Sequence, residues 1–372
     1  MRIGFDAKRA FHNASGLGNY SRDVLRILAT HRPEHAYVAY NPKPARVPFA
    51  PRNGAVEVRL PSTVLGRALP AVWRQAFILR DLRRDRIDLF HGLSAELPRG
   101  LARAGIPGVV TIHDLIFERM PELYAGVDRR IYRAKARRAL AEARRVVAIS
   151  EQTRRDLVEL YGADPGRVRV VYQGCHEAFQ QEIPDDVLAR VALERHLPSE
   201  LILSVGTVEP RKNLALAVRA LARIPGVALV VVGRPTAYLR EVERVAASCG
   251  VSDRVVRLEA VSTAELAALY RLSRALVYPS RYEGFGIPIV EALFSGTPVV
   301  TTRGGCFEEA GGPGSAYVDP DDAEGLAREL SAILEDPGRR ERMRAEGLAH
   351  AARFRDEAVA ARLFEVYEEA VR

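Results

Sequence analysis

Short apolar runs alternate with longer amphipathic segments along almost the whole chain. The apolar runs have the composition of buried parallel strands, and the segments between them carry apolar residues at helical spacing. Strands are expected at 2–6, 36–40, 55–60, 87–90, 108–112, 145–149, 168–171, 201–205, 227–232, 254–258, 274–278, 299–301 and 316–318. This strand–helix alternation predicts α/β architecture with parallel sheets covered by helices.

The alternation is interrupted once, at residues 174–198, which we interpret as an interdomain linker. A chain of 372 residues is long enough for two domains that each bury a core. We therefore predict two Rossmann-like, doubly wound domains at 1–180 and 181–355. A last amphipathic helix is expected at 356–372.

The overall composition is that of a globular protein outside the membrane, with 48% hydrophobic and 27% charged residues. The first residues, MRIGFDAKRA, predict a strand and lack the apolar run of a secretory signal. No apolar stretch is long enough to span a bilayer. The three cysteines share no metal-ligand spacing, which indicates a reducing cytoplasm and no metal cluster.

Charge is distributed unevenly between the two halves. Residues 1–180 hold 31 Lys and Arg against 18 Asp and Glu (+13), and residues 181–372 hold 24 against 29 (−5), which sum to +8. Two segments concentrate the basic residues: Arg80, Arg83, Arg84 and Arg86, then Arg129, Arg130, Arg133, Lys135, Arg137 and Arg138. They are either solvated helix faces or a patch for anionic lipid headgroups at the inner face of a membrane. Nucleic acid is disfavoured as a partner because no stacking platform or zinc-finger spacing accompanies them.

The most informative stretch is VYPSRYEGFGIPIVEALFSGTPVVTT, residues 277–302. It predicts a strand, a polar loop with Glu283, and a helix that starts near Pro288 and carries Glu291. Gly284 and Gly286 would present backbone N–H groups at the helix start, where open parallel sheets bind anions.

A second loop, GTVEPRKNL at 206–214, supplies Arg211 and Lys212 between a strand and a helix. Cations suit phosphates, and the carboxylates Glu283 and Glu291 suit hydroxyl groups, so a sugar nucleotide is the favoured ligand. The alternative is that the two acids only cap and salt-bridge one helix. No His or Cys clusters near them, which disfavours a transition-metal site.

In the first half, Gly16 and Gly18 bracket the predicted start of a helix that follows the first strand. The pair is either a tight turn or a phosphate-binding loop, and it lacks the full dinucleotide fingerprint. His91 and His113 each follow a predicted strand, and His91 is expected to be a structural hydrogen bonder.

The motifs EGFGIPIVE and GTVEPRKN together resemble the family-4 retaining glycosyltransferases, which have the GT-B fold. Further matching segments are spread along the chain: GLGNY, TIHDL, VVAISEQTRRDL, VVYQG and FEEAGG. The resemblance implies two domains facing across a cleft, with the acceptor on the first and the nucleotide-sugar donor on the second. The final helix would return to the first domain.

The resemblance also implies individual roles. Arg211 and Lys212 match the diphosphate clamp, Glu283 the acid beside the donor sugar, Glu291 the acid on the ribose, and His113 a histidine that reaches the donor sugar. Other donor-binding positions are the glycine loop of the first domain and the backbone around the acidic motif: Gly16, Gly18, Gly206, Phe285, Gly286 and Ile287. Retention would proceed by front-face attack without a metal or any cofactor besides the donor.

One departure concerns Thr207, where many relatives have an arginine, so that Arg211 would have to supply this charge. The EPRKN motif favours GDP-mannose as donor, with other GDP-sugars or UDP-sugars as alternatives. The acceptor would be a glycan or a lipid-linked molecule in the synthesis of cell-surface polysaccharide or glycolipid.

Other functions use the same fold. A sugar-nucleotide epimerase would turn over its substrate without an acceptor, and a non-catalytic protein would bind the nucleotide sugar without transfer. A phosphorylase is disfavoured by the scarcity of lysines, and a nicotinamide oxidoreductase by the incomplete glycine fingerprint.

Overall fold

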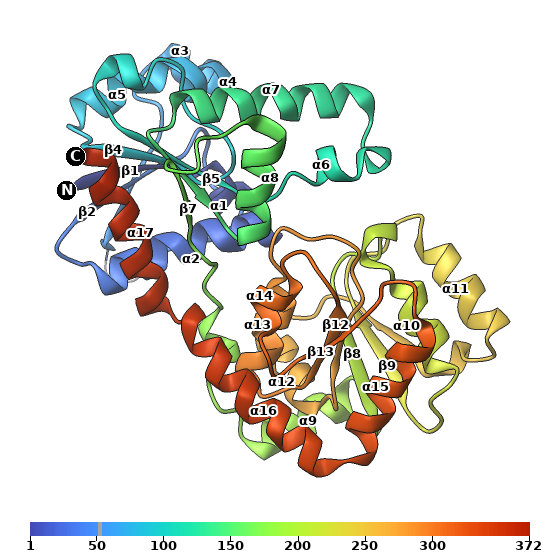
Figure 1. The fold of residues 1–372 in the computed structure, drawn as a ribbon. Coiled ribbons are helices and arrows are strands. Elements are labelled where there is room, and N and C mark those ends of the chain that lie inside the picture. Colours follow the sequence, from blue (N-terminus) through green and yellow to red (C-terminus); the bar gives the residue numbers. More distant parts are fainter. Residues whose placement is uncertain (51–53) are drawn as a thin grey trace. The chain divides into compact units, whose positions relative to one another are not determined.

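The computed structural model describes residues 1–50 and 54–372 and divides into two units, each built on one parallel sheet (Figure 1). Unit 1 comprises Met1–Gly174 and Phe354–Arg372, and unit 2 comprises Cys175–Arg353. The prediction of two Rossmann-like domains with parallel sheets is confirmed.

Within the described residues, the sheet of unit 1 has seven strands in the order β3-β2-β1-β4-β5-β6-β7, and every pairing is parallel. The strands are β1 (Arg2–Asp6), β2 (Ala36–Tyr40), β3 (Val56–Arg59), β4 (Leu89–Gly92), β5 (Gly108–Ile112), β6 (Arg145–Ala148) and β7 (Val168–Val170). Their inward-facing apolar residues are almost completely buried, as the continuous apolar runs predict.

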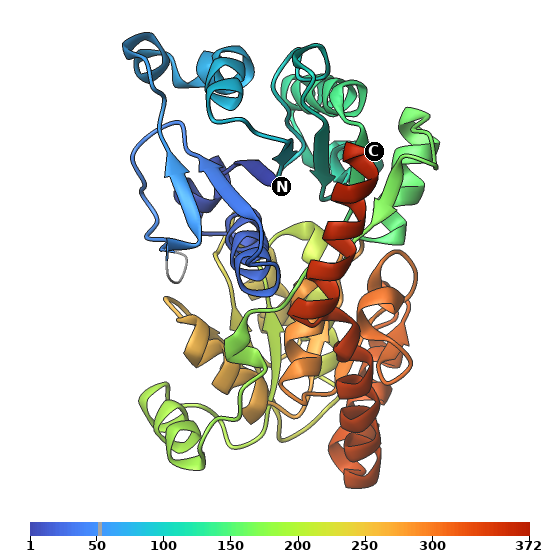
Figure 2. The same ribbon diagram turned by 90° about the vertical axis from the view of Figure 1, so that its left-hand side faces the viewer.

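The helices of unit 1 cover both faces of this sheet (Figure 2). They are α1 (Lys8–His12), α2 (Gly16–His31), α3 (Val64–Ala68), α4 (Pro70–Val72), the π-helical turn η2 (Trp73–Phe77), α5 (Ile78–Arg84), η3 (Ala102–Ala104), α6 (Ile116–Arg119), η4 (Pro121–Leu123), α7 (Gly126–Glu142), α8 (Glu151–Tyr161) and α17 (Asp356–Val371). The short turn η8 (Ala352–Phe354) leads into α17.

Helix α17 packs against α2 and belongs to unit 1 although it ends the chain (Figures 1 and 2). Asp356 forms an ion pair with Arg26 of α2, and the Tyr367 hydroxyl lies 2.8 Å from Nδ1 of His91 in β4. Polar pairs between buried surfaces fix the position of a helix more specifically than apolar contacts alone.

Unit 2, over its described residues, has six parallel strands in the order β10-β9-β8-β11-β12-β13. They are β8 (Leu201–Val205), β9 (Ala228–Val232), β10 (Val255–Leu258), β11 (Leu276–Tyr278), β12 (Val299–Thr302) and β13 (Ala316–Val318). The helices are η5 (Glu177–Phe179), α9 (Asp185–Glu194), η6 (Pro210–Lys212), α10 (Leu214–Leu221), α11 (Leu239–Ser248), η7 (Ser252–Arg254), α12 (Thr263–Leu272), α13 (Ile287–Phe294), α14 (Phe307–Gly311), α15 (Ala323–Glu335) and α16 (Pro337–Ala351).

The boundaries of the units differ from the predicted 180 and 355. Unit 2 begins at Cys175 because Phe179 is buried against Tyr270 of α12, with ring centroids 5.7 Å apart. Unit 1 resumes at Phe354 because this ring packs on Tyr172, 5.3 Å away. Phe179 and Phe354, the two buried rings that set the boundaries, each lie next to a predicted boundary, at 180 and 355.

The predicted linker at 174–198 is also more ordered than expected. It contains α9, which packs against α12 as part of unit 2. The sequence pattern did not reveal this helix because only Val191 of it is fully buried.

Candidate active site

The order of strands in unit 2 reverses between β8 and β11, which are neighbours although β9 and β10 separate them in sequence. In open parallel sheets, ligands bind beyond the carboxyl ends of the strands at such a switch point. The two loops here are residues 206–213 and 279–286. They contain the two motifs that the sequence singled out.

The structure brings the two loops together at one carboxylate. Arg211 Nη1 lies 2.6 Å from Glu283 Oε2, and Lys212 Nζ lies 2.5 Å from Glu283 Oε1. Glu283 is only 9% exposed. Burial alone would raise the pKa of Glu283, but the charges of Lys212 and Arg211 outweigh it and lower the pKa to about 2. Glu283 is therefore ionised at neutral pH and holds two cations at the switch point.

Both cations have further partners that fix their positions. Arg211 donates to the carbonyl oxygen of Tyr282 (2.6 Å) and to Oε1 of Glu209 (2.5 Å). Lys212 donates to the hydroxyl of Tyr278 at the end of β11 (2.6 Å). Such pre-positioned cations need little reorganisation when a negative charge develops nearby.

Backbone conformation places this cationic turn. Asn213 follows η6 with φ of 55°, a left-handed conformation that Asn tolerates, and its side chain donates to the carbonyl of Pro320 (2.8 Å). Gly206 has φ of 139°, and a Cβ on the neighbouring Gly233 would lie 1.8 Å from the Gly206 carbonyl oxygen. The loop can thus leave β8 sharply only with glycine at both positions.

Helix α13 begins beside Glu283. Gly286, with φ of 110°, is its N-cap and offers no capping side chain, and Ile287 and Pro288 form the first turn. The backbone N–H groups at such a helix start suit an anion. The side chain of Phe285 is buried, so only its backbone can meet a ligand.

Glu291 lies one turn further along α13 and is partly buried. Its Oε2 accepts a hydrogen bond from the Tyr270 hydroxyl of α12 (2.8 Å). The two acids therefore have different surroundings. The alternative that both acids only cap and salt-bridge one helix is wrong for Glu283, because Glu283 pairs with cations of another loop.

Two residues at this site were missed by sequence reasoning. The sequence pattern predicts Tyr278 only as the last residue of a strand, yet its hydroxyl accepts a hydrogen bond from Lys212. Ser280 lines the same small cavity as Gly206, Thr207 and Lys212, and its buried Oγ has no hydrogen-bond partner among the described residues. The break at Pro279-Ser280 after an apolar strand was the available signal for both.

In unit 1, a cavity of about 230 Å³ is lined by Arg9, Leu17 and His113 among others; Leu17 lies between Gly16 and Gly18, but neither glycine lines the cavity. Gly16 is the first residue of α2, and the short helix α1, which was not predicted, separates it from β1. A Cβ on Gly18 would lie 1.8 Å from the carbonyl oxygen of Asn13, so Gly18 is required by packing, whereas Gly16 has open space.

His113 directly follows β5, as predicted. It donates from Nε2 to the carbonyl oxygen of Leu93 (2.9 Å), and its ring lies edge-on to Tyr20. Burial lowers the pKa of His113 to about 4, so the imidazole is neutral at pH 7.

The predicted strand at 87–90 would place His91 just beyond its end, and this prediction is wrong. His91 is inside β4, completely buried, and bonded to Tyr367 and to Oγ1 of Thr111 (2.8 Å each). The observed strand is Leu89–Gly92 because Leu89 to His91 pair with β1 and Phe90 to Gly92 pair with β5. The expected structural role of His91 is confirmed.

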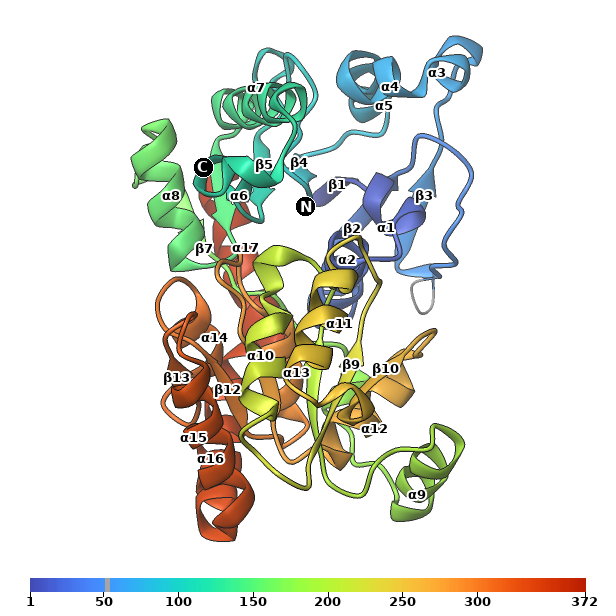
Figure 3. The same ribbon diagram turned by 90° about the vertical axis from the view of Figure 1, so that its right-hand side faces the viewer.

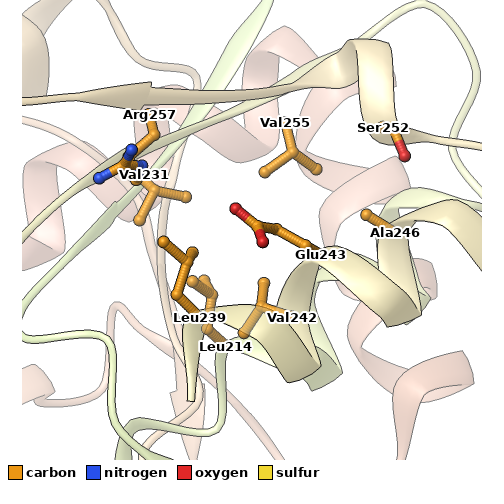
Figure 4. A pocket seen from close by; sticks show the side chains of 9 residues that line it. All are labelled: Leu214, Val231, Leu239, Val242, Glu243, Ala246, Ser252, Val255 and Arg257. Atoms are coloured by element: carbon orange, nitrogen blue, oxygen red, sulfur yellow. The ribbon is translucent and has the colours of Figure 1, made fainter. Parts of the chain in front are cut away.

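A second hollow of about 250 Å³ lies over β9 and the edge strand β10. Figure 4 shows Glu243 of α11 pointing into it between Leu239, Val242 and Val255. None of the predicted site residues lines this hollow, and most of its walls are apolar side chains of the unit 2 core.

Within 1–50 and 54–372, no three His, Cys, Asp or Glu residues are arranged to hold a metal ion. None of the described helices is both long and apolar enough to cross a membrane. Among the described residues, Cys175, Cys249 and Cys306 form no disulfide bond.

Comparisons with known proteins identify both halves. Residues 14–179 match the family model "Glycosyltransferase Family 4", and residues 189–350 match "Glycosyl transferases group 1". The two matches meet near the boundary between the units.

Among curated proteins, a D-inositol 3-phosphate glycosyltransferase of Xylanimonas cellulosilytica is 38% identical over 242 residues, covering 61% of this chain and 57% of that protein. The O-antigen chain mannosyltransferase B of Escherichia coli is 28% identical over 378 residues, covering 95% and 96%. A D-inositol 3-phosphate glycosyltransferase of Streptosporangium roseum is 32% identical, covering 83% and 74%.

Solved structures share the fold at low identity. Anabaena HepE in complex with UDP superposes with a TM-score of 0.75 at 20% identity, covering 99% of this chain and 100% of that one. Sucrose-phosphate synthase from Thermosynechococcus elongatus gives a TM-score of 0.76 at 21% identity, covering 99% and 98%. These similarities identify the GT-B architecture.

Proposed function

The chain belongs to the family-4 glycosyltransferases of the GT-B fold, and we propose that it is a retaining, metal-independent hexosyltransferase that uses a nucleotide-diphosphate sugar. In this proposal unit 2 binds the donor and unit 1 binds the acceptor. The observation that carries it is the pair of cations, Arg211 and Lys212, held on Glu283 at the switch point of unit 2.

The chemistry of the reaction requires charge stabilisation above all. When the bond from the sugar to the diphosphate breaks, negative charge grows on the leaving oxygen. Arg211 and Lys212 would stabilise this charge, because their side chains are already positioned by Tyr282, Glu209 and Tyr278. In front-face attack, the departing oxygen takes the proton of the acceptor hydroxyl, and no enzyme nucleophile is needed.

The two acids would orient the donor. Glu283, ionised and next to the first turn of α13, would accept hydrogen bonds from sugar hydroxyls, while Glu291 would accept from the ribose. The uncapped start of α13 at Gly286 and Ile287 and the loop glycine Gly206 would accommodate the diphosphate. His113, neutral at pH 7, would reach the donor sugar as a hydrogen-bonding group rather than a cation.

We propose a mannosyl unit from GDP-mannose as the transferred group. Support comes from the similarity to a protein named O-antigen chain mannosyltransferase B, which extends over 95% of the chain. The acceptor would be a glycan or lipid-linked molecule of a cell-surface polysaccharide or glycolipid.

Thermal shift measurement with GDP, UDP, ADP, CDP and TDP tests the donor base. GDP should raise the midpoint of unfolding most, because only a bound ligand stabilises the folded state. A transfer assay with the matching radiolabelled sugar nucleotide then separates the alternatives. Turnover without acceptor would indicate an epimerase, and binding without turnover a non-catalytic protein. The anomeric configuration of the product, read by NMR, tests retention.

We also propose that unit 1 associates with an anionic membrane surface. Exposed apolar side chains on its helices accompany the basic half of the chain, among them Val64 of α3 (82% exposed) and Val127 of α7 (67% exposed). Apolar insertion combined with basic residues is typical of peripheral binding. Co-sedimentation with anionic vesicles should exceed that with neutral vesicles, and equal binding would contradict the proposal.

A further inference from the structure

The sheet of unit 1 has its own switch point, between β1 and β4. Beyond the carboxyl ends of these strands lies a cavity of about 330 Å³, lined by residues from α1, α4, η2, α7 and the loop after β4. Its size is in the range of small-molecule sites, and its place is where open parallel sheets bind ligands. Figure 3 shows α4 and α7 as neighbours at this end of unit 1.

The cavity is strongly cationic. Lys8, Arg74, Lys135 and Arg138 line it, against Glu96 as the one carboxylate among the described lining residues. The four cations come from three different elements, α1, η2 and α7, so the concentration of charge is not the exposed face of a single helix.

Two of the four cations are held in place by carboxylates. Arg74 donates to Asp6 Oδ2 (2.7 Å) and pairs with Glu96 Oε2 (2.6 Å), and Lys135 Nζ lies 3.0 Å from Glu96 Oε1. Asp6, Arg74 and Glu96 are about nine-tenths buried. Arg74 also sits in the π-helical turn η2, a distortion frequent at functional sites.

The other two cations are not neutralised. Across the part of the chain that the structure describes, neither Lys8 nor Arg138 forms an ion pair with a carboxylate, although both line the cavity. Burial, and next the charge of Arg74, lower the pKa of Lys8. Lys8 is partly buried, and within the described ranges four cations face only the carboxylates of Asp6 and Glu96, so the cluster has an excess of positive charge that a bound anion would offset.

We propose that this cavity, lined by Lys8, Arg74, Lys135 and Arg138 at the β1/β4 switch point, binds a phosphate group carried by the acceptor. The inference rests on the proposed function, which places the acceptor on unit 1. Arg74 and Lys135 form the fixed wall, while Lys8 and Arg138 provide the free charge-assisted hydrogen bonds. The phosphate belongs either to a lipid-linked acceptor or to a soluble sugar phosphate.

Isothermal titration of the full-length protein tests this site. The donor site is first saturated with the nucleoside diphosphate that the thermal-shift panel identifies, so that added anions cannot bind at Arg211 and Lys212. The probes are mannose 1-phosphate and farnesyl phosphate, with mannose and farnesol as neutral counterparts. We expect a phosphate probe to bind and its neutral counterpart not to bind, with an affinity that falls as salt is added.

The variants Lys8→Met and Arg138→Gln should each weaken binding of the phosphate probe at least about tenfold, since each removes a charge-assisted hydrogen bond. Arg137→Gln is the matched control, because Arg137 is the exposed neighbour of Arg138 on α7 and does not line the cavity. Lys43→Met is the control for an exposed lysine of unit 1. The melting temperature should not fall in any of the four variants, which excludes unfolding as the cause of weaker binding.

Each outcome decides the proposal. Binding of farnesyl phosphate alone assigns a lipid-linked acceptor, and binding of mannose 1-phosphate assigns a soluble one. The proposal is overturned if the wild type binds neither phosphate at millimolar concentration, if the neutral probes bind equally well, or if both variants bind like the wild type. If no nucleoside diphosphate binds, the titration is repeated in a Lys212→Ala background. If the Lys8 and Arg138 substitutions abolish phosphate binding in the Lys212→Ala background, the anion site is supported although the proposed transferase function is contradicted.

Discussion

The two switch points of this protein handle charge in opposite ways. In unit 2, one buried carboxylate, Glu283, is shared by two cations. In unit 1, Glu96 is shared by Arg74 and Lys135, and Lys8 and Arg138 remain without a carboxylate partner among the described residues. The same position in the same kind of sheet thus has a nearly balanced cluster in one unit and an excess of positive charge in the other.

The difference shows how one architecture can serve two kinds of ligand. A balanced cluster keeps cations in place while exposing little net charge, which suits a site where charge develops only during reaction. An unbalanced cluster attracts a ligand that is charged before it binds.

The largest effect is expected for Lys212→Ala. The loss of one pre-positioned cation beside the leaving group should lower kcat by about 10²- to 10³-fold, as for removal of one oxyanion-type donor. Steady-state kinetics with the correct donor measures it, and Lys8→Met should by comparison affect mainly the KM for the acceptor. An unchanged kcat in Lys212→Ala would remove this residue from the mechanism.

Glu283→Gln is expected to destabilise unit 2 by about 3 kcal/mol, because it leaves two partly buried cations without their shared counter-ion. Guanidinium unfolding of the variant and wild type measures the difference. Lys8→Met should cost little stability, since among the described residues no carboxylate forms an ion pair with the Lys8 ammonium group. Equal losses in the two variants would show that the contrast between the sites does not exist.

The stability of the protein should fall in acid through Glu283. Its pKa is about 2 in the folded chain and near its ordinary value in the unfolded chain. Between these values the unfolded chain binds more protons, so the stabilisation present at neutral pH is lost as the pH falls from about 5 toward 2. Unfolding free energies measured at several pH values should show a steeper decline in the wild type than in Glu283→Gln. Parallel curves would indicate that Glu283 is not the responsible group.

The smallest effect is expected for Tyr278→Phe. It removes the hydroxyl that accepts from Lys212 but leaves the ion pair of Lys212 with Glu283 intact. A hydrogen bond from a charged donor contributes about 1.5 kcal/mol at the low end of its range, so kcat should fall by about tenfold while the melting temperature changes little. A loss as large as that of Lys212→Ala would mean that Tyr278 itself takes part in the reaction.

Sequence patterns predicted most of the fold because the strands of both sheets are buried on two faces. Their apolar runs are therefore continuous and easily recognised, and the expected strands at 2–6, 36–40, 108–112, 201–205 and 316–318 coincide with those observed. Elements with few buried residues escaped prediction, namely α1, α3 and α9. Their positions depend on contacts with distant segments rather than on their own periodicity.

By itself, the sequence determined the two parallel sheets. It also singled out Arg211, Lys212, Glu283 and Glu291 as site residues, since local spacing places these four side chains after strands and at a helix start. Only the tertiary structure decided which charges meet. It placed Glu283 between the two cations, moved His91 into the core, and gathered Lys8, Arg74, Glu96 and Arg138 at one cavity. Ion pairing depends on distances between elements that are remote in sequence, and these distances are set by the strand order together with the packing of the helices and loops.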